Sequence, residues 1–185
     1  MSIEEVFYEA SRTSGAFAKV SGLQCPPGCG ACCLSPHHEA TIAEMLPMAA
    51  FLWETAGAEA VLSRINNAAV PSTCVMYAPS PQDPQQGRCL AYEFRPLTCR
   101  LFGFCGRRDK QGHKEYMPCR IFKEQFPDNV ARVQAAVAQG LDVPLIGDHA
   151  MKVFSVDPQL GAQALPINQA LLKAIERAGL LKDMA

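Results

Sequence analysis

The chain has 185 residues, of which 49% are hydrophobic and 19% are charged, and its formal net charge is −1. This composition is typical of a globular protein and excludes an intrinsically disordered chain, so we expect a single domain over residues 1–185. The near-neutral charge lacks the basic footprint of a protein that binds nucleic acid or an acidic membrane surface, and we expect neither as a partner.

The N-terminus has no basic segment followed by a long apolar run, and no stretch is apolar enough to span a bilayer. We therefore expect a cytoplasmic protein, in a compartment that keeps thiols reduced. The nine cysteines are an odd number and all lie between residues 25 and 119. Such clustering favours a metal site over a disulfide framework.

The first predicted element is a helix over residues 3–20. Ser2 and Glu5 have the spacing of a capping box, in which each side chain accepts a hydrogen bond from the other residue's backbone amide. Apolar residues then recur at helical spacing until Gly22, which we expect to end the helix.

Further helices are predicted after the first cysteine-rich loop. Pro36 favours a helix start, because its missing amide does no harm in the first turn. Pro47 predicts a break or kink within the apolar pattern that follows. We expect a helix over residues 48–56 with Gly57 as its C-cap, and another over residues 58–69.

Residues 71–120 form an irregular region that is rich in proline, glycine and cysteine. Residues 74–77 and 88–92 resemble two short strands of a β-hairpin, and residues 96–102 can form a single helical turn. We expect a metal cross-link to keep this region ordered, because the free energy of metal binding adds to the free energy of folding.

The C-terminal part of the chain returns to a helical pattern. Asp128 is predicted to cap a helix that ends near Gln139, and residues 166–178 form an amphipathic helix that Gly179 should end. Residues 141–165 are expected to form a loop-like connection. The predicted fold is therefore mainly α, with helices packed around a cysteine-rich core at residues 25–119 that includes a short β-hairpin.

The spacing of the N-terminal cysteines indicates metal ligation. Cys29 and Cys32 form a Cys-x-x-Cys pair whose sulfurs can converge on one centre, and Cys25 can reach it around the intervening turn. Adjacent residues tend to point apart, so Cys33 either serves a second centre or requires a sharp bend in the loop. Three local ligands and a remote fourth are typical of an iron–sulfur cluster, whereas eight cysteines could instead form two zinc sites.

The segment from Cys89 to Arg100 contains an Arg-Pro-x-x-Cys-Arg element. Together with the run from Cys25 to Cys33, it resembles the bacterial YkgJ-type Cys-x-x-Cys-x-x-Cys-Cys family of zinc- or iron-chelating domains, although the first gap here is three residues long. The resemblance implies metal chelation and suggests an iron–sulfur or redox role. It implies eight metal ligands and leaves Cys105 as a structural or free thiol. These ligands are Cys25, Cys29, Cys32, Cys33, Cys74, Cys89, Cys99 and Cys119.

Other residues near the cysteines have two interpretations each. Arg95 and Arg100 flank Cys99 and could bind the cofactor by neutralising or hydrogen-bonding its thiolates, or they could form surface salt bridges. His37 and His38 follow the cluster and could bind zinc, although a partly exposed helix start is the commoner place for such residues.

The functional expectation is a metal-binding protein with an iron–sulfur cluster, most simply [4Fe–4S]. Its role would be electron transfer, redox sensing or support of an enzyme, with a protein redox partner. The alternative is a structural zinc protein that acts as an interaction module. A third hypothesis is an enzyme that uses a labile cluster iron or a free cysteine. It is weaker, because the sequence shows no phosphate loop, nucleophile elbow or paired carboxylates that would indicate catalysis.

Overall fold

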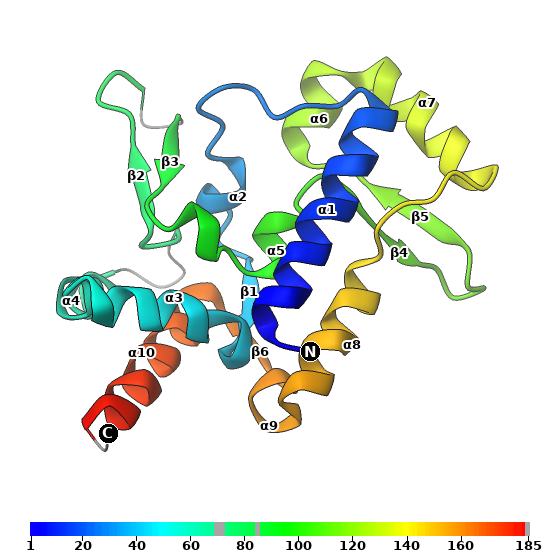
Figure 1. The fold of residues 1–185 in the computed structure, drawn as a ribbon. Coiled ribbons are helices and arrows are strands. Elements are labelled where there is room, and N and C mark those ends of the chain that lie inside the picture. The colour runs from blue at the N-terminus through cyan, green and yellow to red at the C-terminus, as the bar shows by residue number, and fades with distance from the viewer. Residues whose placement is uncertain (69–72, 84–85, 184–185) are drawn as a thin grey trace.

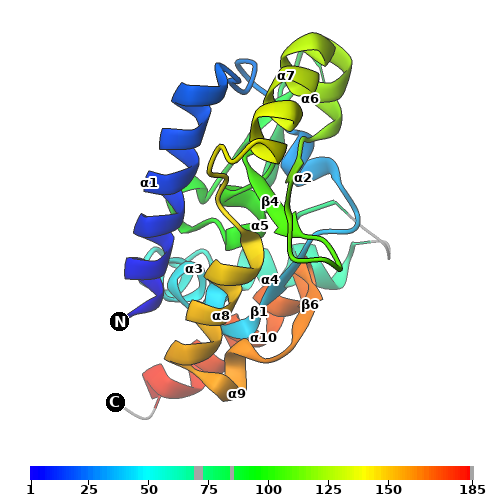
Figure 2. The ribbon, with the colours of Figure 1, turned by 90° about the vertical axis from the view of Figure 1, so that its right-hand side faces the viewer.

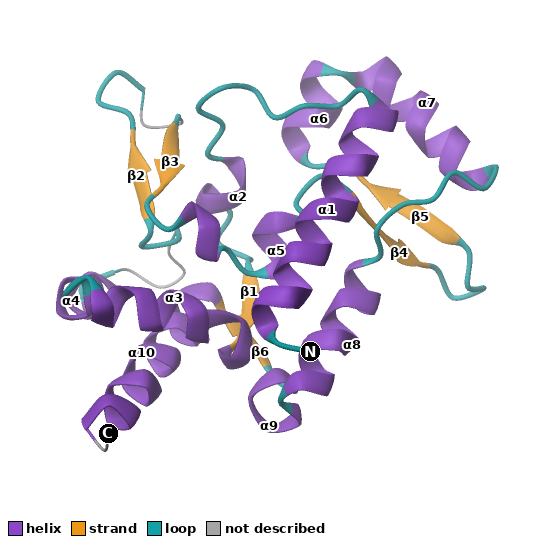
Figure 3. Ribbon diagram, viewed as in Figure 1, coloured by secondary structure: helices purple, strands orange, loops and turns teal. Residues whose placement is uncertain are grey.

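Ten α-helices dominate the described part of the chain, and they are joined by three two-stranded antiparallel sheets (Figures 1 and 3). The computed structural model describes residues 1–68, 73–83 and 86–183. The predicted mainly α fold of one small domain is confirmed. No helix in these ranges combines the length and the apolarity that crossing a bilayer would need.

Helix α1 (Ile3–Ser21) begins and ends as the sequence predicts. The Glu5 amide donates to the Ser2 hydroxyl over 3.3 Å, and the Ser2 amide donates to the Glu5 carboxylate over 2.7 Å. Gly22 follows the helix with a left-handed φ of 69°, where a Cβ would be disfavoured. The apolar face of α1, including Val6 and Phe7, is buried.

The predicted helix start at Pro36 is wrong. A four-residue helix, α2 (Ala31–Leu34), lies within the cysteine-rich loop, and β1 (Glu39–Thr41) follows it. The next helix, α3 (Ile42–Glu54), starts behind Thr41, which forms a second capping box with Glu44. This capping box satisfies free amides at the start of α3, a local signal for a helix start that Pro36 does not supply.

Helix α3 continues through Pro47 without the predicted break. It packs against α10 (Ile167–Asp183), and this packing offsets the backbone hydrogen bond that proline removes. The residue in left-handed conformation after α3 is Ala56, with a φ of 55°, and not Gly57. The Gly57 amide donates to the Leu52 carbonyl over 2.8 Å, which closes the helix end.

Helix α4 (Ala58–Asn66) is shorter than predicted, and Ala69, the predicted last residue, lies outside the described residues. The predicted hairpin is present as β2 (Tyr77–Pro79) and β3 (Gly87–Cys89), with Tyr77 opposite Cys89. Its first strand begins only at Tyr77, the last residue of the predicted strand, and its second strand ends at Cys89 rather than at Tyr92. The predicted helical turn after Pro96 is α5 (Leu97–Arg100), preceded by the 3₁₀ turn η1 (Tyr92–Phe94).

A second hairpin, which the sequence did not predict, precedes the C-terminal helices. Strands β4 (Cys105–Arg108) and β5 (Lys114–Met117) are joined by a turn in which the Asp109 carboxylate accepts two backbone amide hydrogen bonds. Two helices follow, α6 (Arg120–Gln125) and α7 (Pro127–Ala138).

The sequence predicted Asp128 as the cap of α7, and this prediction is wrong. Pro127 occupies the first helical position, so Asp128 falls inside the first turn. The expectation of a loop over residues 141–165 is also wrong. That segment forms α8 (Ile146–Val156), α9 (Pro158–Gly161) and the start of β6 (Ala164–Pro166), which pairs with β1.

The predicted helix end at Gly179 is likewise wrong, since α10 passes through this residue. A Cβ at Gly179 would lie 2.8 Å from the Trp53 ring, so the glycine allows α3 and α10 to approach closely.

The elements that carry cysteines lie between two helical regions. Figures 1 and 2 show α6 and α7 at one end of the molecule and α10 at the other, with α1 extending between them. Helices α3 and α10 form an apolar cluster that includes three of the predicted ligands, and Cys119 lies at the edge of a second cluster beside α7. The three ligands in the first cluster are Cys33, Cys74 and Cys99.

Candidate metal centre

The loop from Cys25 to Cys33 is shaped by two glycines. Gly28 has a φ of 70°, and the Cys29 amide donates to the Pro26 carbonyl over 3.1 Å, so residues 26–29 form a tight turn. This turn accommodates the three-residue gap between Cys25 and Cys29. A Cβ at Gly30 would lie 2.6 Å from the Tyr77 ring, so glycine is required for the β2–β3 hairpin to pack on the loop.

Five cysteines lie together in the interior, and we call them the inner thiol group. The Cys33 thiol lies beside the sulfurs of Cys32 and Cys89, and all three line one cavity. Interaction among the three raises the pKa of Cys33 far above its usual range and lowers the pKa of Cys32 to about 7 and that of Cys89 to about 6. The group consists of Cys32, Cys33, Cys74, Cys89 and Cys99.

Cys74 and Cys99 belong to the inner thiol group because the pKa of Cys99 responds to the charges of its neighbours. Burial raises the pKa of Cys99, and the charges of Cys32 and Cys74 raise it further. Cys32 and Cys33 therefore face shared space, as the sharp bend considered from the sequence requires. The bend is the single helical turn of α2, which begins after Gly30.

Backbone amides approach the inner sulfurs. Burial raises the pKa of Cys74 to about 11, while a hydrogen bond from the Met76 amide lowers it. The Ala91 amide, two residues after Cys89, likewise donates to the Cys89 sulfur and lowers its pKa. The Cys74 amide in turn donates to the Cys33 carbonyl over 3.0 Å. Amide donors of this kind stabilise thiolates that bind a metal.

Cys25, Cys29 and Cys119 form a second set nearer the surface, which we call the outer thiol group. Burial raises the pKa of Cys25 to about 11, and the charges of Cys29, Cys119 and the inner Cys32 contribute to the shift. The Phe122 amide lies 3.5 Å from the Cys119 sulfur, and the Ile121 amide also donates to it. Cys25 is exposed, whereas the other two are partly buried.

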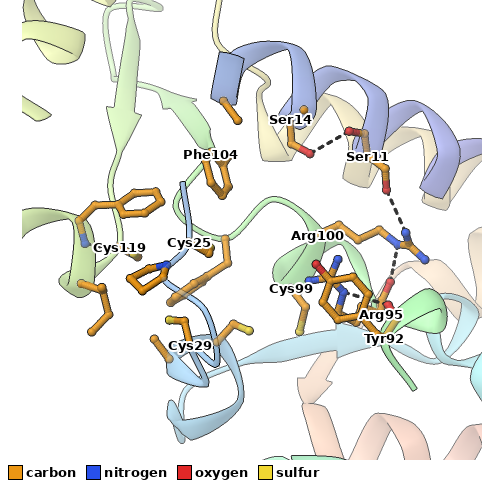
Figure 4. A pocket seen from close by; sticks show the side chains of 18 residues that line it. Ser11, Ser14, Cys25, Cys29, Tyr92, Arg95, Cys99, Arg100, Phe104 and Cys119 are labelled. Carbon is orange, nitrogen blue, oxygen red and sulfur yellow. Dashed lines mark hydrogen bonds between the residues drawn. The ribbon is translucent and has the colours of Figure 1, made fainter. Parts of the chain in front are cut away.

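Two adjoining cavities connect the groups. One, of about 300 Å³, is lined by the whole outer group and by Cys32 and Cys99 (Figure 4). The other, of about 290 Å³, shares part of this lining and extends to Cys33 and Cys89. Figure 4 shows the outer group on one side of the first cavity and Cys99 on the other. Helix α1 forms another wall of this cavity, through Ser11, Ser14, Gly15 and Ala18.

The two predicted arginines have different surroundings. Arg95 stacks on Tyr92, with its guanidinium carbon 3.4 Å from the ring centroid. Its charge is a secondary influence that lowers the pKa of thiols in both groups, opposing the effect of burial on Cys25 and Cys99. Arg95 lines both cavities and so lies near the sulfurs that border them.

Arg100 instead holds the backbone around the turn η1. Its guanidinium donates to the carbonyls of Glu93 and Arg95 and to the Ser11 hydroxyl, the last over 2.9 Å. It also lies 4.4 Å from the Phe7 ring centroid. These contacts tie the loop before α5 to helix α1, so the side chain positions the segment that carries Cys99.

Neither histidine that follows the loop lines the two cavities described above. His38 is buried, its Nδ1 lies 3.3 Å from the Thr98 hydroxyl, and its ring packs edge-on against Phe102. His37 is exposed. Cys105 is buried in the apolar cluster of α1 and α8, outside both thiol groups.

Gly103 is a site residue that sequence reasoning missed. It has a φ of 78°, and a Cβ there would lie 3.3 Å from the Cys119 sulfur, so its backbone passes directly beside this predicted ligand. The available signal was a glycine between Phe102 and Phe104 in a cysteine-rich stretch. Among the described residues, no three cysteine, histidine or acidic side chains are already at the mutual spacing of ligands to one ion.

Residues 24–120, more than half of the chain and all eight predicted ligands, match a family model named CxxCxxCC and described as "Putative zinc- or iron-chelating domain". The chain belongs to the CxxCxxCC family. No curated protein and no solved structure matches it. Membership in the CxxCxxCC family supports metal binding by this chain, and both zinc and iron fall within the family description. Helix α1, which forms one wall of the larger cavity, lies outside the CxxCxxCC segment.

Proposed function

We propose that this CxxCxxCC protein carries an iron–sulfur cluster, most simply [4Fe–4S], in its inner thiol group and serves a protein partner as a one-electron redox centre. Electron transfer, redox sensing and support of an enzyme are all forms of this role. The observation that carries the proposal is the gathering of cysteines around two adjoining cavities, of about 290 and 300 Å³, which Cys32, Cys33, Cys89 and Cys99 of the inner group line. A reducing cytoplasm would keep these thiols available for the cluster.

The donor set supports a cluster for three reasons. Its ligands are sulfurs alone, which iron–sulfur clusters prefer, and four of the five inner sulfurs suffice for a cubane. The cavity offers room for a multi-atom group beside the sulfurs. Amide hydrogen bonds to Cys74 and Cys89 stabilise negative charge on sulfur, as a reduced cluster requires.

The inner cysteines and the two arginines each have a part in this proposal. The inner sulfurs would hold the cluster, which supplies one-electron transfer when bound. Arg95 would offset negative charge, because its guanidinium acts on thiols in the lining of both cavities. Arg100 would keep the loop that carries Cys99 in place through its three hydrogen-bond acceptors.

A structural zinc site is the second candidate function. The inner cysteines join the α2 turn, the β2–β3 hairpin and α5, and each of these elements has only three or four residues. A closed site of four thiolates would fix such short elements relative to one another and leave no position for chemistry. This observation favours zinc as a cross-link for an interaction module.

Purification without air distinguishes the two candidates. We expect a brown protein with iron and sulfide in equal amounts, whose absorption near about 400 nm bleaches on reduction. The double variant Cys89→Ala/Cys99→Ala leaves three inner sulfurs and should lose the iron, whereas Cys105→Ala should keep it, because Cys105 lies outside both thiol groups. A colourless protein with stoichiometric zinc would contradict the cluster and support the zinc module.

A further inference from the structure

The larger cavity has a polar side and an aromatic side. Figure 4 shows Ser11, Arg95 and Arg100 together on one side of this space, with Phe104 on the other. The Phe104 ring packs edge-on against Phe122, which is fully buried and also lines the cavity, and the ring centroids are 5.1 Å apart. Because Phe122 is anchored in the core, the aromatic side of the cavity is fixed in place.

We propose that the larger cavity binds a small aromatic carboxylate, with its carboxylate on Arg95 and Ser11 and its ring against Phe104 and Phe122. This binding activity goes beyond a redox or structural role of the cysteines. It does not depend on which metal the cysteines hold, because none of these four residues is a proposed metal ligand.

Arg95 has hydrogen-bond donors left for a ligand. Its Nε donates to the Tyr92 carbonyl over 2.9 Å and its guanidinium stacks on the Tyr92 ring, so the plane of the group is fixed. Among the described residues, no carboxylate and no carbonyl accepts a hydrogen bond from its two terminal amino groups, although Arg95 lines the cavity. A guanidinium held in this way can donate two parallel hydrogen bonds to a carboxylate.

Ser11 is the second donor on the polar side. Arg100 donates to two backbone carbonyls and to the Ser11 hydroxyl oxygen, so its own hydrogen bonds are used within the protein. The Ser11 oxygen is therefore an acceptor, and its own proton has no acceptor in the described part of the chain. The Ser14 hydroxyl differs, because it donates to the Ser11 carbonyl over 3.2 Å.

The charge of the lining favours an anion. Within the described ranges, no aspartate or glutamate lines either of the two adjoining cavities. Apart from the cysteines, the charged side chains that line them are those of Arg88, Arg95 and Arg100. An arginine with no carboxylate beside it leaves positive charge that a bound anion can neutralise.

The size of the larger cavity limits the ligand to about one ring. Its volume of about 300 Å³ lies at the lower end of the range of ~300–1,000 Å³ found for small-molecule pockets. An aromatic ring fits the aromatic side, since rings gain from packing edge-on or offset against one another. Gly15 is exposed and lines the same cavity, and a Cβ there would meet no atom within 4 Å, so the cavity is open on this side.

Calorimetric titration of the full-length protein with benzoate tests the site. Benzoate should bind with a dissociation constant on the order of 1 mM or tighter. Benzamide keeps the ring without the charge, and acetate keeps the charge without the ring, so each should bind at least about tenfold more weakly. Benzoate that does not bind, or that binds no better than either of the other two, would overturn the proposal.

Two pairs of variants test the location of the bound benzoate. Arg95→Gln should weaken benzoate binding at least about tenfold, whereas Arg107→Gln should not, because Arg107 is exposed and pairs with Glu115. Gly15→Leu should also weaken it by narrowing the open side of the cavity. Gly147→Leu is its control, at an exposed helical position that lines neither cavity.

The two leucine variants should fold, because a Cβ at either glycine would meet no atom within 4 Å. Unchanged affinity for benzoate in Arg95→Gln or in Gly15→Leu would place the anion elsewhere and overturn the proposal. The result is independent of the metal analysis. A colourless zinc protein that binds benzoate through Arg95 would exclude the cluster and support this site, and a brown protein that does not bind benzoate would do the reverse.

Discussion

At the scale of single residues, the two arginines of the Arg-Pro-x-x-Cys-Arg element have different contacts, although the sequence predicted the same role for both. Arg95 lies over the cavities, and its charge acts on thiols of both groups. Arg100 is occupied by backbone carbonyls and the Ser11 hydroxyl. The first therefore affects the charge around the thiols, and the second affects the stability of the loop that carries Cys99.

We predict that Arg95→Gln lowers the reduction potential of the inner centre by on the order of tens of millivolts, because a positive charge near the thiolates stabilises the reduced state. Iron content should stay unchanged, and protein-film voltammetry can measure the potential. Arg107→Gln is the matched control, since Arg107 is exposed and pairs with Glu115. An equal shift in both variants would assign the effect to net charge alone.

His149 provides a pH-dependent contribution to stability. Burial lowers the pKa of this histidine, while the nearby carboxylates of Glu9 and Asp148 raise it and Lys152 lowers it. Because the folded pKa is below that of the unfolded chain, the unfolded state binds a proton first as the pH falls. The contribution is therefore complete above about pH 7 and decreases below about pH 6.5.

We predict that His149→Gln makes the free energy of unfolding less sensitive to pH between about pH 7 and about pH 5.5. Urea unfolding at both pH values would measure this sensitivity. His113→Gln serves as the control, because the His113 side chain is 79% exposed. The same pH dependence in His149→Gln and the native protein would show that His149 is not responsible.

At the scale of elements, local signals determine the helices and tertiary contacts determine the rest. The capping boxes at Ser2 and Thr41 lie next to the helices that they start, and only the first was recognised from the sequence. Strand β6 could not be predicted, because its partner β1 lies more than a hundred residues away. The eight cysteines predicted as ligands were chosen from spacing and from the family resemblance, and that ligand set stays a prediction. Their arrangement in space could not be predicted, because it depends on how the hairpin and α5 pack against the loop.

The end of α3 offers a direct test of backbone strain. Ala56 adopts a φ of 55°, a region that a Cβ disfavours. Ala56→Gly should therefore stabilise the protein by about 1 kcal/mol in urea unfolding. Ala56→Val should have the opposite effect, because a β-branched side chain is strained further there. A loss of stability in Ala56→Gly would contradict this explanation.

Helix α10 supports the inner thiol group from outside the CxxCxxCC segment. The Val75 amide donates to the Asn168 side-chain oxygen over 3.0 Å, and the Asn168 amide group donates to the Thr73 carbonyl over 2.9 Å. These bonds hold the backbone on both sides of Cys74. Asn168 is 9% exposed, so its removal would leave buried polar groups without these partners.

We predict that Asn168→Ala lowers the free energy of unfolding by about 2 kcal/mol. It should also accelerate the loss of the inner metal to a chelator, measured by absorbance or by a metallochromic dye. Gln169→Ala, at an exposed position of the same helix, is the matched control. A stability loss without faster metal release would show that Asn168 supports the helix packing but not the ligand loop.

At the scale of the whole molecule, the chain combines a helical frame with segments that need a cross-link. Helices α3 and α10 share an extensive apolar cluster, including Leu52, Leu171 and Ile175. The β2–β3 hairpin has three paired residues on each strand, and a two-stranded hairpin of this size is marginal alone in water.

Metal removal should therefore affect the two parts differently. After chelation we expect amide hydrogen exchange to increase in residues 25–34 and 86–100, while α3 and α10 keep their protection. Mass spectrometry of peptide fragments would measure it. Reloaded protein should recover the original pattern, and a uniform increase throughout the chain would show that the frame also depends on the metal.

The wall that helix α1 contributes to the larger cavity has a consequence for how this chain divides its tasks. The thiols lie within the CxxCxxCC segment, but Ser11, Ser14 and Gly15, which border the space in front of them, lie before it. The residues proposed to bind metal and part of the wall that limits access to them therefore come from different parts of the chain. Substitution on this face of α1 should change the space beside the thiols without altering any proposed ligand.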